Sequence, residues 1–198
     1  MIAAGLVLAA GAGTRFGQTP KQLVRLGDRP LLQWAVDAQT RVDPGLLAPV
    51  LVVLGAHAER VREGIVPGRA RVVVCEDWRL GQSASLKHGL RALGDVERVV
   101  VTLGDAPLVS SALIARFARE PDSGRALRAV YGGRPGHPVA LGRAQVRTLL
   151  AAAGERDEGA RALLRDARTI EASHLCSGRD VDTPEDLEEV RNEARAIV

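Results

Sequence analysis

Residues Leu6–Leu23 read LVLAAGAGTRFGQTPKQL, an apolar run that opens into a loop rich in glycine. The run Leu6–Leu8 is typical of a buried strand. The glycines of the loop lack a Cβ atom, so the backbone can turn tightly there and approach a ligand closely. Arg15 and Lys21 add two cations to the same loop. Exposed N–H groups and two positive side chains at the carboxyl end of a strand predict a polyphosphate-binding site.

Two better-known phosphate loops do not fit this stretch. The dinucleotide-binding pattern G-x-G-x-x-G fails because Phe16 occupies the position of the third glycine. The P-loop pattern fails because no Gly-Lys-Ser/Thr follows. The alternative is an ordinary loop between a strand and a helix, with solvated cations. Three glycines alone would favour that alternative, but Arg15, Pro20 and Lys21 at these spacings favour a nucleotide site.

The composition indicates one ordinary globular domain, residues 1–198. Apolar residues make up 46% of the chain and charged residues 26%, so a packed core is expected. Aromatic residues make up only 3%, and the stacking platforms of a single-strand nucleic-acid binder are therefore missing. The net charge of +3 is small and the arginines are dispersed. We expect no nucleic-acid partner.

Cysteine usage and the N-terminus indicate the compartment. Cys75 and Cys176 do not form a CxxC pair, so neither metal nor disulfide chemistry is expected of them. The N-terminus enters the first strand without the basic region and cleavage site of a signal peptide. No apolar run reaches the length of a membrane span. We therefore expect a cytoplasmic protein without a membrane partner.

Strand patterns alternate with helix patterns along almost the whole chain. The expected strands are 4–10, 50–54, 72–75, 99–103, 127–131, 139–141 and 169–175. The expected helices are 31–39, 58–63, 83–93, 110–119, 143–152, 157–164 and 184–196. Ser110 and Thr183 are the predicted caps of the fourth and the last of these helices. Buried apolar strands separated by helices form a mostly parallel sheet with helices on both faces. The sequence thus predicts a single-domain, three-layer, Rossmann-like α/β fold.

Ligands of such sheets lie outside the carboxyl ends of the strands. This rule predicts that four loops lie close together in space, those that start at Gly11, Glu76, Gly104 and Gly132. The segment 132–138, GGRPGHP, is predicted as a rigid loop, which makes His137 a candidate contact for a phosphate or a heterocycle. The alternative for His137 is an ordinary surface residue that makes a hydrogen bond.

Asp105 follows the expected strand 99–103 directly, in the sequence LGDAP, where Gly104 is expected to let a ligand approach. A carboxylate at this place can bind Mg²⁺, which takes few protein oxygens and completes its shell with water and phosphate. Asp182, just before the last helix, is a second candidate ligand. Both have an ordinary alternative, because an aspartate can cap a turn or favour a helix N-terminus.

Three further polar residues are candidates with weaker signals. Arg161, on the expected helix 157–164, can pair with an acceptor phosphate, although a solvated arginine on a helix face is the simpler interpretation. Asp77 and Ser85 belong to a segment at a strand end that can contact a base and a ribose. Trp78 in the same segment can instead cover a small core.

The pattern of the glycine loop, L-A-A-G-x-G-T-R-F-G-x-x-P-K-Q, resembles the signature of the MobA/MocA-like nucleotidyltransferases, which transfer a nucleotide from an NTP. Later motifs of this family follow in order, so the resemblance covers nearly the whole chain. They lie at Trp78–Leu90, Leu103–Pro107, Gly136–Pro138, Asp157–Arg161 and Asp180–Asp186. The MocA-like branch, the molybdenum cofactor cytidylyltransferases, is the most similar, because Ala10 stands where the guanylyltransferase branch usually carries a glycine.

The resemblance implies a fold similar to nucleotide-diphospho-sugar transferases, CTP as donor, Mg²⁺ as cofactor and a molybdopterin-type acceptor. A molybdoenzyme or its maturation factor is the implied protein partner. The implied catalytic residues are Arg15, Lys21 and Asp105, and the implied metal ligands are Asp105 and Asp182. The implied nucleotide contacts are Leu8, Ala9, Ala10, Gly11, Ala12, Gly13, Arg15, Lys21, Asp77 and Ser85. The implied acceptor contacts are His137, Asp157 and Arg161.

The sequence also departs from the family pattern and leaves alternatives open. Ala106 stands where methionine or glutamine is common, Arg156 where glycine is usual, and the segment at Trp78 matches approximately. The alternatives are a guanylyltransferase that uses GTP, an NAD(P)H-dependent oxidoreductase of the nicotine-pigment type, and a carrier that binds a nucleotide without turnover. Cytidylyltransferases of isoprenoid synthesis share the first motif but lack the Gly-His-Pro motif and the late Asp-Thr-Pro-Glu-Asp motif.

Overall fold

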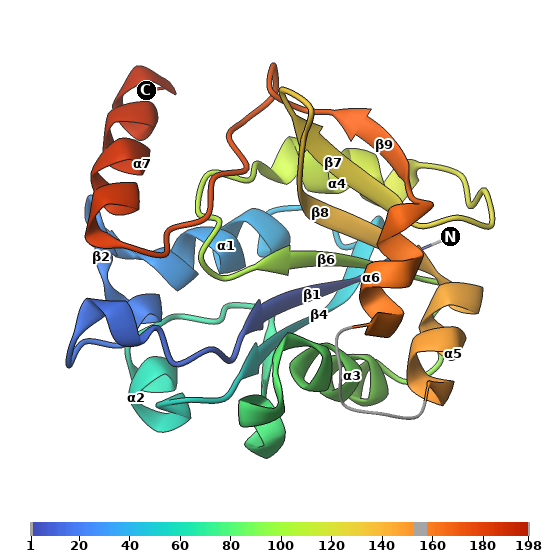
Figure 1. The fold of residues 1–198 in the computed structure, drawn as a ribbon, viewed down its shortest axis with the longest axis horizontal. Coiled ribbons are helices and arrows are strands. Elements are labelled where there is room, and N and C mark those ends of the chain that lie inside the picture. The colour runs from blue at the N-terminus through green and yellow to red at the C-terminus, as the bar shows by residue number, and fades with distance from the viewer. Residues whose placement is uncertain (1, 153–157, 198) are drawn as a thin grey trace.

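The apolar run near the N-terminus forms strand β1 (Ala3–Ala9), in which every residue is buried. In the computed structural model, which describes residues 2–152 and 158–197, β1 lies between two parallel neighbours. These are β4 (Leu47–Leu54) and β6 (Arg98–Leu103). The described strands form one seven-stranded sheet in the order β5-β4-β1-β6-β8-β7-β9 (Figure 1), beside a small two-stranded hairpin. The other strands of the large sheet are β5 (Arg71–Val74), β7 (Leu127–Tyr131), β8 (Arg134–Gly142) and β9 (Arg168–Glu171).

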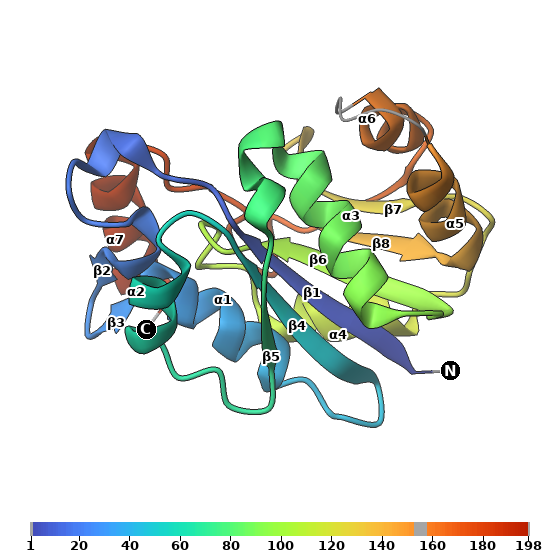
Figure 2. The same ribbon diagram turned by 90° about the horizontal axis from the view of Figure 1, so that it is seen from below.

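Helices cover both faces of the sheet (Figures 1 and 2). Successive side chains of a strand point to opposite faces, so Val7 packs into one core cluster while Leu6 and Leu8 pack into the other. The cluster around Val7 includes α1 (Leu31–Thr40), α2 (Ala58–Glu63) and α4 (Ser111–Arg119). The cluster around Leu6 includes α3 (Gln82–Leu93), α5 (Arg143–Ala151) and α6 (Glu158–Arg165). The prediction of a three-layer, mostly parallel α/β domain is confirmed.

The segment 132–138 is not the loop that the sequence predicted. Gly132 and Gly133 alone make the turn, with φ angles of +57° and +79°, and β8 begins at Arg134. Positive φ at both central residues is typical of a two-residue hairpin turn whose twist matches its strands. The prolines of this segment argued against a strand, because proline cannot donate to a ladder. In β8 they precede Val139–Gly142, the part that pairs with β6.

β8 also runs antiparallel to both β6 and β7, whereas the other strand pairs of this sheet are parallel. The predicted strand 169–175 is shorter than expected, because β9 ends at Glu171. A turn follows, in which the N–H groups of Leu175 and Cys176 donate to the carbonyl oxygen of Ala172. The chain can thereby reverse and return to the carboxyl edge of β6.

The C-terminal segment ends in α7 (Pro184–Ile197), which lies apart from α5 and α6 at the opposite end of the molecule (Figure 1). As predicted, Thr183 caps this helix: its Oγ1 accepts from the N–H of Asp186 at 3.1 Å. Leu187 of α7 packs with Leu26 of the hairpin β2 (Arg25–Leu26) and β3 (Arg29–Pro30). Among the described residues, no helix combines the length and the apolar character that crossing a membrane requires.

Candidate active site

A pocket of about 330 Å³ lies outside the carboxyl ends of β1 and β6. The glycine loop, the 3₁₀ helix η3 (Glu76–Leu80) and the start of α3 meet around it. Asp105, which follows β6, lines it as well. The sequence-predicted nucleotide contacts that line it are Leu8, Ala9, Ala10, Gly11, Gly13, Lys21 and Ser85. The loops that start at Gly11, Glu76 and Gly104 therefore meet as the rule for ligands at the carboxyl edge predicted, whereas the loop that starts at Gly132 does not line this pocket.

Three predicted nucleotide contacts do not line this pocket: Ala12, Arg15 and Asp77. Asp77 is exposed on η3. The Arg15 side chain is 66% exposed, and its Nη1 lies 3.8 Å from Oδ2 of Asp182. The structure thus places Arg15 beside the candidate metal ligand Asp182.

Gln22 closes the glycine loop onto the end of β1, a role that the sequence did not reveal. It belongs to the 3₁₀ helix η2 (Lys21–Leu23) and is 4% exposed. Its Nε2 donates to the carbonyl oxygens of Ala9 at 2.9 Å and Gly11 at 2.6 Å. The sequence shows Gln22 in the motif P-K-Q, but only the fold shows that its side chain connects the glycine loop to the end of β1. Trp78 lies in the pocket wall with Arg79 stacked on its ring, 4.6 Å from the centroid.

Gly13 is fixed by both its backbone conformation and its neighbour. Its φ is +59°, and an added Cβ atom would lie 2.4 Å from Cβ of Lys21. We predict that Gly13→Ala costs more than the roughly 1–2 kcal/mol of a left-handed non-glycine residue, because it also displaces Lys21. Gly68→Ala is the matched control, since Gly68 has φ +58° and no atom within 4 Å of an added Cβ. Urea unfolding compares the two variants, and equal losses of stability would contradict the prediction.

Lys21 joins the two carboxylates that the sequence predicted as metal ligands. Its Nζ donates to Oδ2 of Asp105 at 2.5 Å and to Oδ1 of Asp182 at 2.9 Å. The N–H of Val181 donates to the carbonyl oxygen of Asp105 at 2.9 Å and so fixes the segment before α7 against the end of β6. The Lys21 side chain is 12% exposed. In this structure its ammonium group is therefore paired with carboxylates within the pocket.

The charges of this cluster perturb one another. Burial by itself lowers the pKa of Lys21, but the carboxylates of Asp105 and Asp182 outweigh burial and raise that pKa above its usual 10.5. Lys21 therefore stays protonated at neutral pH. Asp180 is exposed as a whole residue, yet crowding of its carboxyl group by protein atoms, together with the charges of Asp105 and Asp182, raises its pKa to about 6. Carboxylates thus accumulate at this end of the sheet.

The donor atoms of this cluster fit a hard divalent cation. Oδ1 of Asp105 is buried and has no hydrogen-bond partner in the described part of the chain. The Asp182 side chain, 55% exposed, presents a second carboxylate beside the same ammonium group. No group of three or more His, Cys, Asp or Glu residues suited to a metal occurs among residues 2–152 and 158–197. Two carboxylates suffice for Mg²⁺ when water and substrate phosphates complete its shell.

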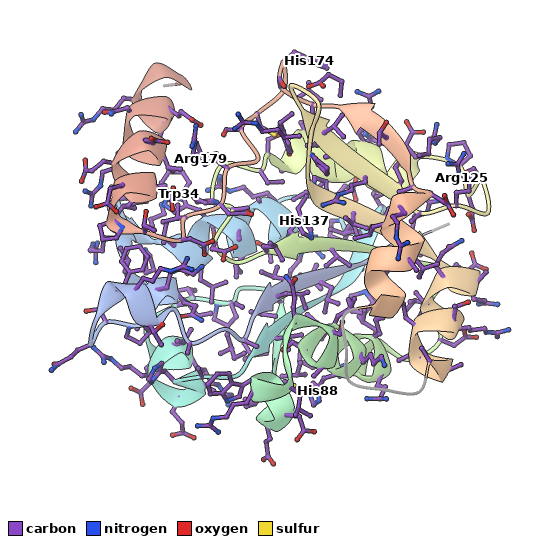
Figure 3. The ribbon with its side chains drawn as sticks, in the orientation of Figure 1. Trp34, His88, Arg125, His137, His174 and Arg179 are labelled. Atoms are coloured by element: carbon purple, nitrogen blue, oxygen red, sulfur yellow. The ribbon has the colours of Figure 1, made fainter. Side chains whose placement is uncertain are left out.

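A second cavity, of about 950 Å³, adjoins the first and shares Leu8 and Gln82 with it. It lies between the sheet and helices α3, α5 and α6, and leucine and valine supply half of its lining residues. We call it the apolar cavity. Its charged and titratable lining residues are Arg128, His137 and Arg165. His137, unlike the peripheral His88 and His174, lies near the middle of the molecule (Figure 3).

His137 was predicted in a loop, but the structure places it on β8 and half-buried. Its backbone carbonyl oxygen accepts a hydrogen bond from the Tyr131 hydroxyl at 2.5 Å. Burial, followed by the positive charge of Arg128, lowers the pKa of the imidazole to about 4. The side chain is therefore neutral at neutral pH and can donate one hydrogen bond and accept another.

This lowered pKa predicts a loss of stability on the acid side. In the unfolded chain His137 becomes protonated below about pH 6.5, whereas in the folded protein it stays neutral down to about pH 4. The free energy of unfolding therefore falls as the pH drops from 6.5 to 4. We expect His137→Gln to lose less stability there than the parent protein. His174→Gln, at an exposed site, is the control. Urea unfolding between pH 7.5 and 4 measures all three proteins, and parallel curves would contradict the prediction.

The remaining predicted acceptor contacts, Asp157 and Arg161, stay predictions. Asp157 lies outside the described residues. Arg161 belongs to α6, and only its place on the helix is described.

Comparison with known proteins covers most of the chain. The model of the MobA-like NTP transferase domain matches residues 5–173, which leaves Asp182 beyond the matched part. Nicotine blue oxidoreductase of Paenarthrobacter nicotinovorans is 34% identical over 196 residues, which cover 92% of this chain and 93% of that protein.

Two solved structures have the same fold over their whole length. A nucleotidyl transferase from Methanothermobacter superposes with a TM-score of 0.82 at 25% identity, covering 100% of this chain and 99% of that one. Rv0371c of Mycobacterium tuberculosis H37Rv, in complex with manganese, superposes with a TM-score of 0.78 at 27% identity, covering 97% and 99%. The chain therefore belongs to the family of the MobA-like NTP transferase domain, and its fold and family are those of nucleotidyltransferases with an NTP as donor.

Proposed function

We propose that this protein transfers CMP from CTP to a phosphate-bearing acceptor of the molybdopterin type, with Mg²⁺ as the divalent cation and pyrophosphate as the second product. One observation carries the proposal: the glycine loop, Lys21 and Asp105 line the same pocket at the carboxyl ends of β1 and β6. The manganese bound to the similar protein Rv0371c supports a divalent cation.

The pocket residues divide into those that bind phosphate and those that bind the cation. The N–H groups of the glycine loop, with Lys21 and Arg15, hold the β- and γ-phosphates of the donor. Lys21 then exchanges carboxylate oxygens for phosphate oxygens, while Asp105 and Asp182 hold the cation. Mg²⁺, when bound, neutralises negative charge on the transferring phosphate.

The reaction forms a bond between an acceptor phosphate oxygen and the α-phosphorus of CTP, and it breaks the bond from that phosphorus to the β-phosphate oxygen. An acceptor phosphate monoester, with a second pKa of about 6, is largely ionised at neutral pH, so no side chain is required as a general base. The protein contributes to the reaction by positioning the donor and the acceptor and by stabilising the negative charge on the transferring phosphate. His137, which is neutral, can orient an acceptor by a hydrogen bond without adding charge.

The preference for CTP over GTP rests on Ala10. This residue is 5% exposed and lines the pocket. Its Cβ and carbonyl oxygen would lie within 2.8 Å of a Cβ added at Gly55, so backbone and side chain are closely packed there. The methyl group takes space that a glycine would leave open, and a smaller pyrimidine base needs less of that space than a purine.

Nucleotide binding and turnover test this function separately. With Mg²⁺ present, we expect CTP to raise the melting temperature more than GTP, ATP or UTP, since a ligand of the folded state stabilises it in proportion to ln(1 + [L]/Kd). Pyrophosphate release with CTP and molybdopterin would support transfer. Binding of CTP without pyrophosphate release from any phosphate-bearing acceptor would instead support a carrier, and equal stabilisation by all four nucleotides would remove the preference for CTP.

An oxidoreductase is the second candidate, because the relative that is 34% identical is named nicotine blue oxidoreductase. The glycine loop lacks the third glycine of a dinucleotide fingerprint, which disfavours this candidate. Sustained oxidation of NADPH in the presence of a quinone-like dye, without pyrophosphate release in the transfer assay, would establish it over the transferase.

A further inference from the structure

The apolar cavity lies where the acceptor of a nucleotide has to enter. It shares Leu8 and Gln82 with the nucleotide pocket, so a molecule inside it can reach the donor without crossing bulk solvent. The role of the cavity's ligand as an acceptor rests on the proposed function, whereas the chemical class of that ligand follows from the residues that line the cavity.

The walls of the cavity favour an apolar body. Side chains of three strands and two helices form them: Val101, Val130, Val139, Leu141, Leu86 and Leu149. The uncharged polar lining residues are Gln82, Ser83, His137 and Thr169. The leucine and valine part of the wall cannot satisfy the hydroxyl groups of a sugar, and an alcohol taken out of water without a new hydrogen bond costs about 1–3 kcal/mol. An apolar or aromatic body loses no hydrogen bonds to water when it enters the cavity, and its burial is favourable by roughly 25 cal/mol per Å².

The charge of the cavity favours an anion. Arg128 and Arg165 are its charged lining residues, and no aspartate or glutamate lines it among the described residues. Arg128 is half-buried, and removal from water lowers the pKa of its guanidinium group. Its Nε donates to the carbonyl oxygen of Gly136 at 3.4 Å, and it has no ion pair in the part of the chain that the structure describes. A guanidinium group withdrawn from water and without a counter-ion is stabilised when an anion binds.

The register of the sheet sets the distance between this anion site and the donor. Arg128 of β7 pairs with Val139 of β8, which pairs with Val101 of β6. Leu8, which the two cavities share, is level with Leu103, two residues further along β6 toward the carboxyl edge. Two residues of a strand span roughly 7 Å, and the three steps from β7 through β8 and β6 to β1 add roughly 14 Å across the sheet, so the backbones of Arg128 and Leu8 lie roughly 16 Å apart. The anion at Arg128 is therefore a separate group from the acceptor phosphate that attacks the donor.

We propose that the apolar cavity is the acceptor site, and that the acceptor has an apolar or aromatic body with a second anionic group, apart from its reacting phosphate, that Arg128 binds. The leucine and valine part of the wall disfavours polyhydroxylated sugars as acceptors.

Three small probes distinguish the contribution of the aromatic rings from that of the charge. The first, 1-naphthyl phosphate, has aromatic rings and a phosphate group; 1-naphthol has the rings without the phosphate, and glucose 1-phosphate has the phosphate on a sugar. By calorimetry on the intact protein we expect 1-naphthyl phosphate to bind one site at least tenfold more tightly than either other probe. Binding should persist when CTP and Mg²⁺ are present. Equal binding of glucose 1-phosphate, or displacement of 1-naphthyl phosphate by CTP, would overturn the proposal.

Variants locate the binding. Arg128→Met keeps the aliphatic stem and should lower the affinity for 1-naphthyl phosphate to that for 1-naphthol. Arg134→Met removes the same charge from an exposed place on β8 and should change nothing. Leu86→Trp, which fills the cavity without altering charge, should abolish binding. An Arg128→Met protein that binds like the parent would overturn the assignment. None of these measurements needs turnover, so a failed transfer assay would refute the proposed function and leave this result standing.

Discussion

Lys21→Ala is expected to lower the rate of nucleotidyl transfer by about 10²–10³-fold, the usual effect of removing one fixed group that stabilises developing charge. The ammonium group of Lys21 stays protonated and lines the pocket beside the glycine loop. It also lies between the carboxylates of Asp105 and Asp182, so its position is fixed before any substrate arrives. Steady-state release of pyrophosphate measures the effect, and nucleotide binding should weaken with and without Mg²⁺.

The chain supplies its own control for this variant. Lys87, on α3, is the other lysine of the sequence, and its Nζ donates to the carbonyl oxygen of Ala152 at 3.0 Å. Lys87→Ala removes the same charge at a distance from the pocket and should keep the parental rate. Far-UV circular dichroism confirms that both variants fold. Parental turnover by a folded Lys21→Ala protein would end the assignment of Lys21 to the donor phosphates.

The same variant should also be less stable at neutral pH. Without the ammonium group, Asp105 and Asp182 face each other as like charges, and the Asp105 side chain is only 25% exposed. Urea unfolding at pH 7.5 measures the loss of stability against the parent protein, with Lys87→Ala as the control.

Asp105→Asn is expected to lower transfer by about 10³-fold, equivalent to about 4 kcal/mol of transition-state stabilisation. Oδ1 of Asp105 is buried and unpartnered in the described structure, and Oδ2 accepts from Lys21. The amide keeps the shape of the side chain and removes the charge that a divalent cation needs. In titrations with Mg²⁺ the variant should require far more metal for half-maximal rate.

Binding without metal separates Asp105→Asn from a general loss of structure. A carboxylate in the pocket repels a triphosphate, so the variant should bind CTP without Mg²⁺ at least as tightly as the parent protein. It should then gain little when Mg²⁺ is added. Asp182→Asn is the comparison: its side chain is 55% exposed, more water surrounds it, and a smaller loss is expected. A normal response of Asp105→Asn to Mg²⁺ would remove this residue from the cation site.

Local sequence patterns were sufficient to predict most helices and strands and the order of the loops around the site. The run Leu6–Leu8 predicted β1, and Ser110 was correctly chosen as the cap of α4, where its Oγ accepts from the N–H of Leu113. Local patterns failed at residues 134–138. Two prolines and a glycine there suggested a loop, but pairing with β7 made the segment a strand. Tertiary pairing overrode the local preference.

One glycine has a second role that the sequence did not show. Gly104 was expected to let a ligand approach and does line the nucleotide pocket, but an added Cβ would also lie 2.8 Å from Cβ of Ala9 and 2.9 Å from Cδ1 of Leu32. Its small size serves the packing of β1 and α1 against the end of β6. Whether a missing side chain leaves room for a ligand or for the protein depends on neighbours distant in sequence.

The sequence by itself determined the layered fold, the edge of the sheet that carries the site and the family, because apolar periods, turn residues and motif spacings are local properties of a chain. Tertiary structure decided that Lys21 lies between Asp105 and Asp182, which stands 161 positions from it. It also decided that Gln22 closes the glycine loop, and that a cavity with apolar walls and two arginines adjoins the nucleotide pocket. These features depend on packing between segments that are distant in sequence. No short stretch of sequence determines the distances between such segments.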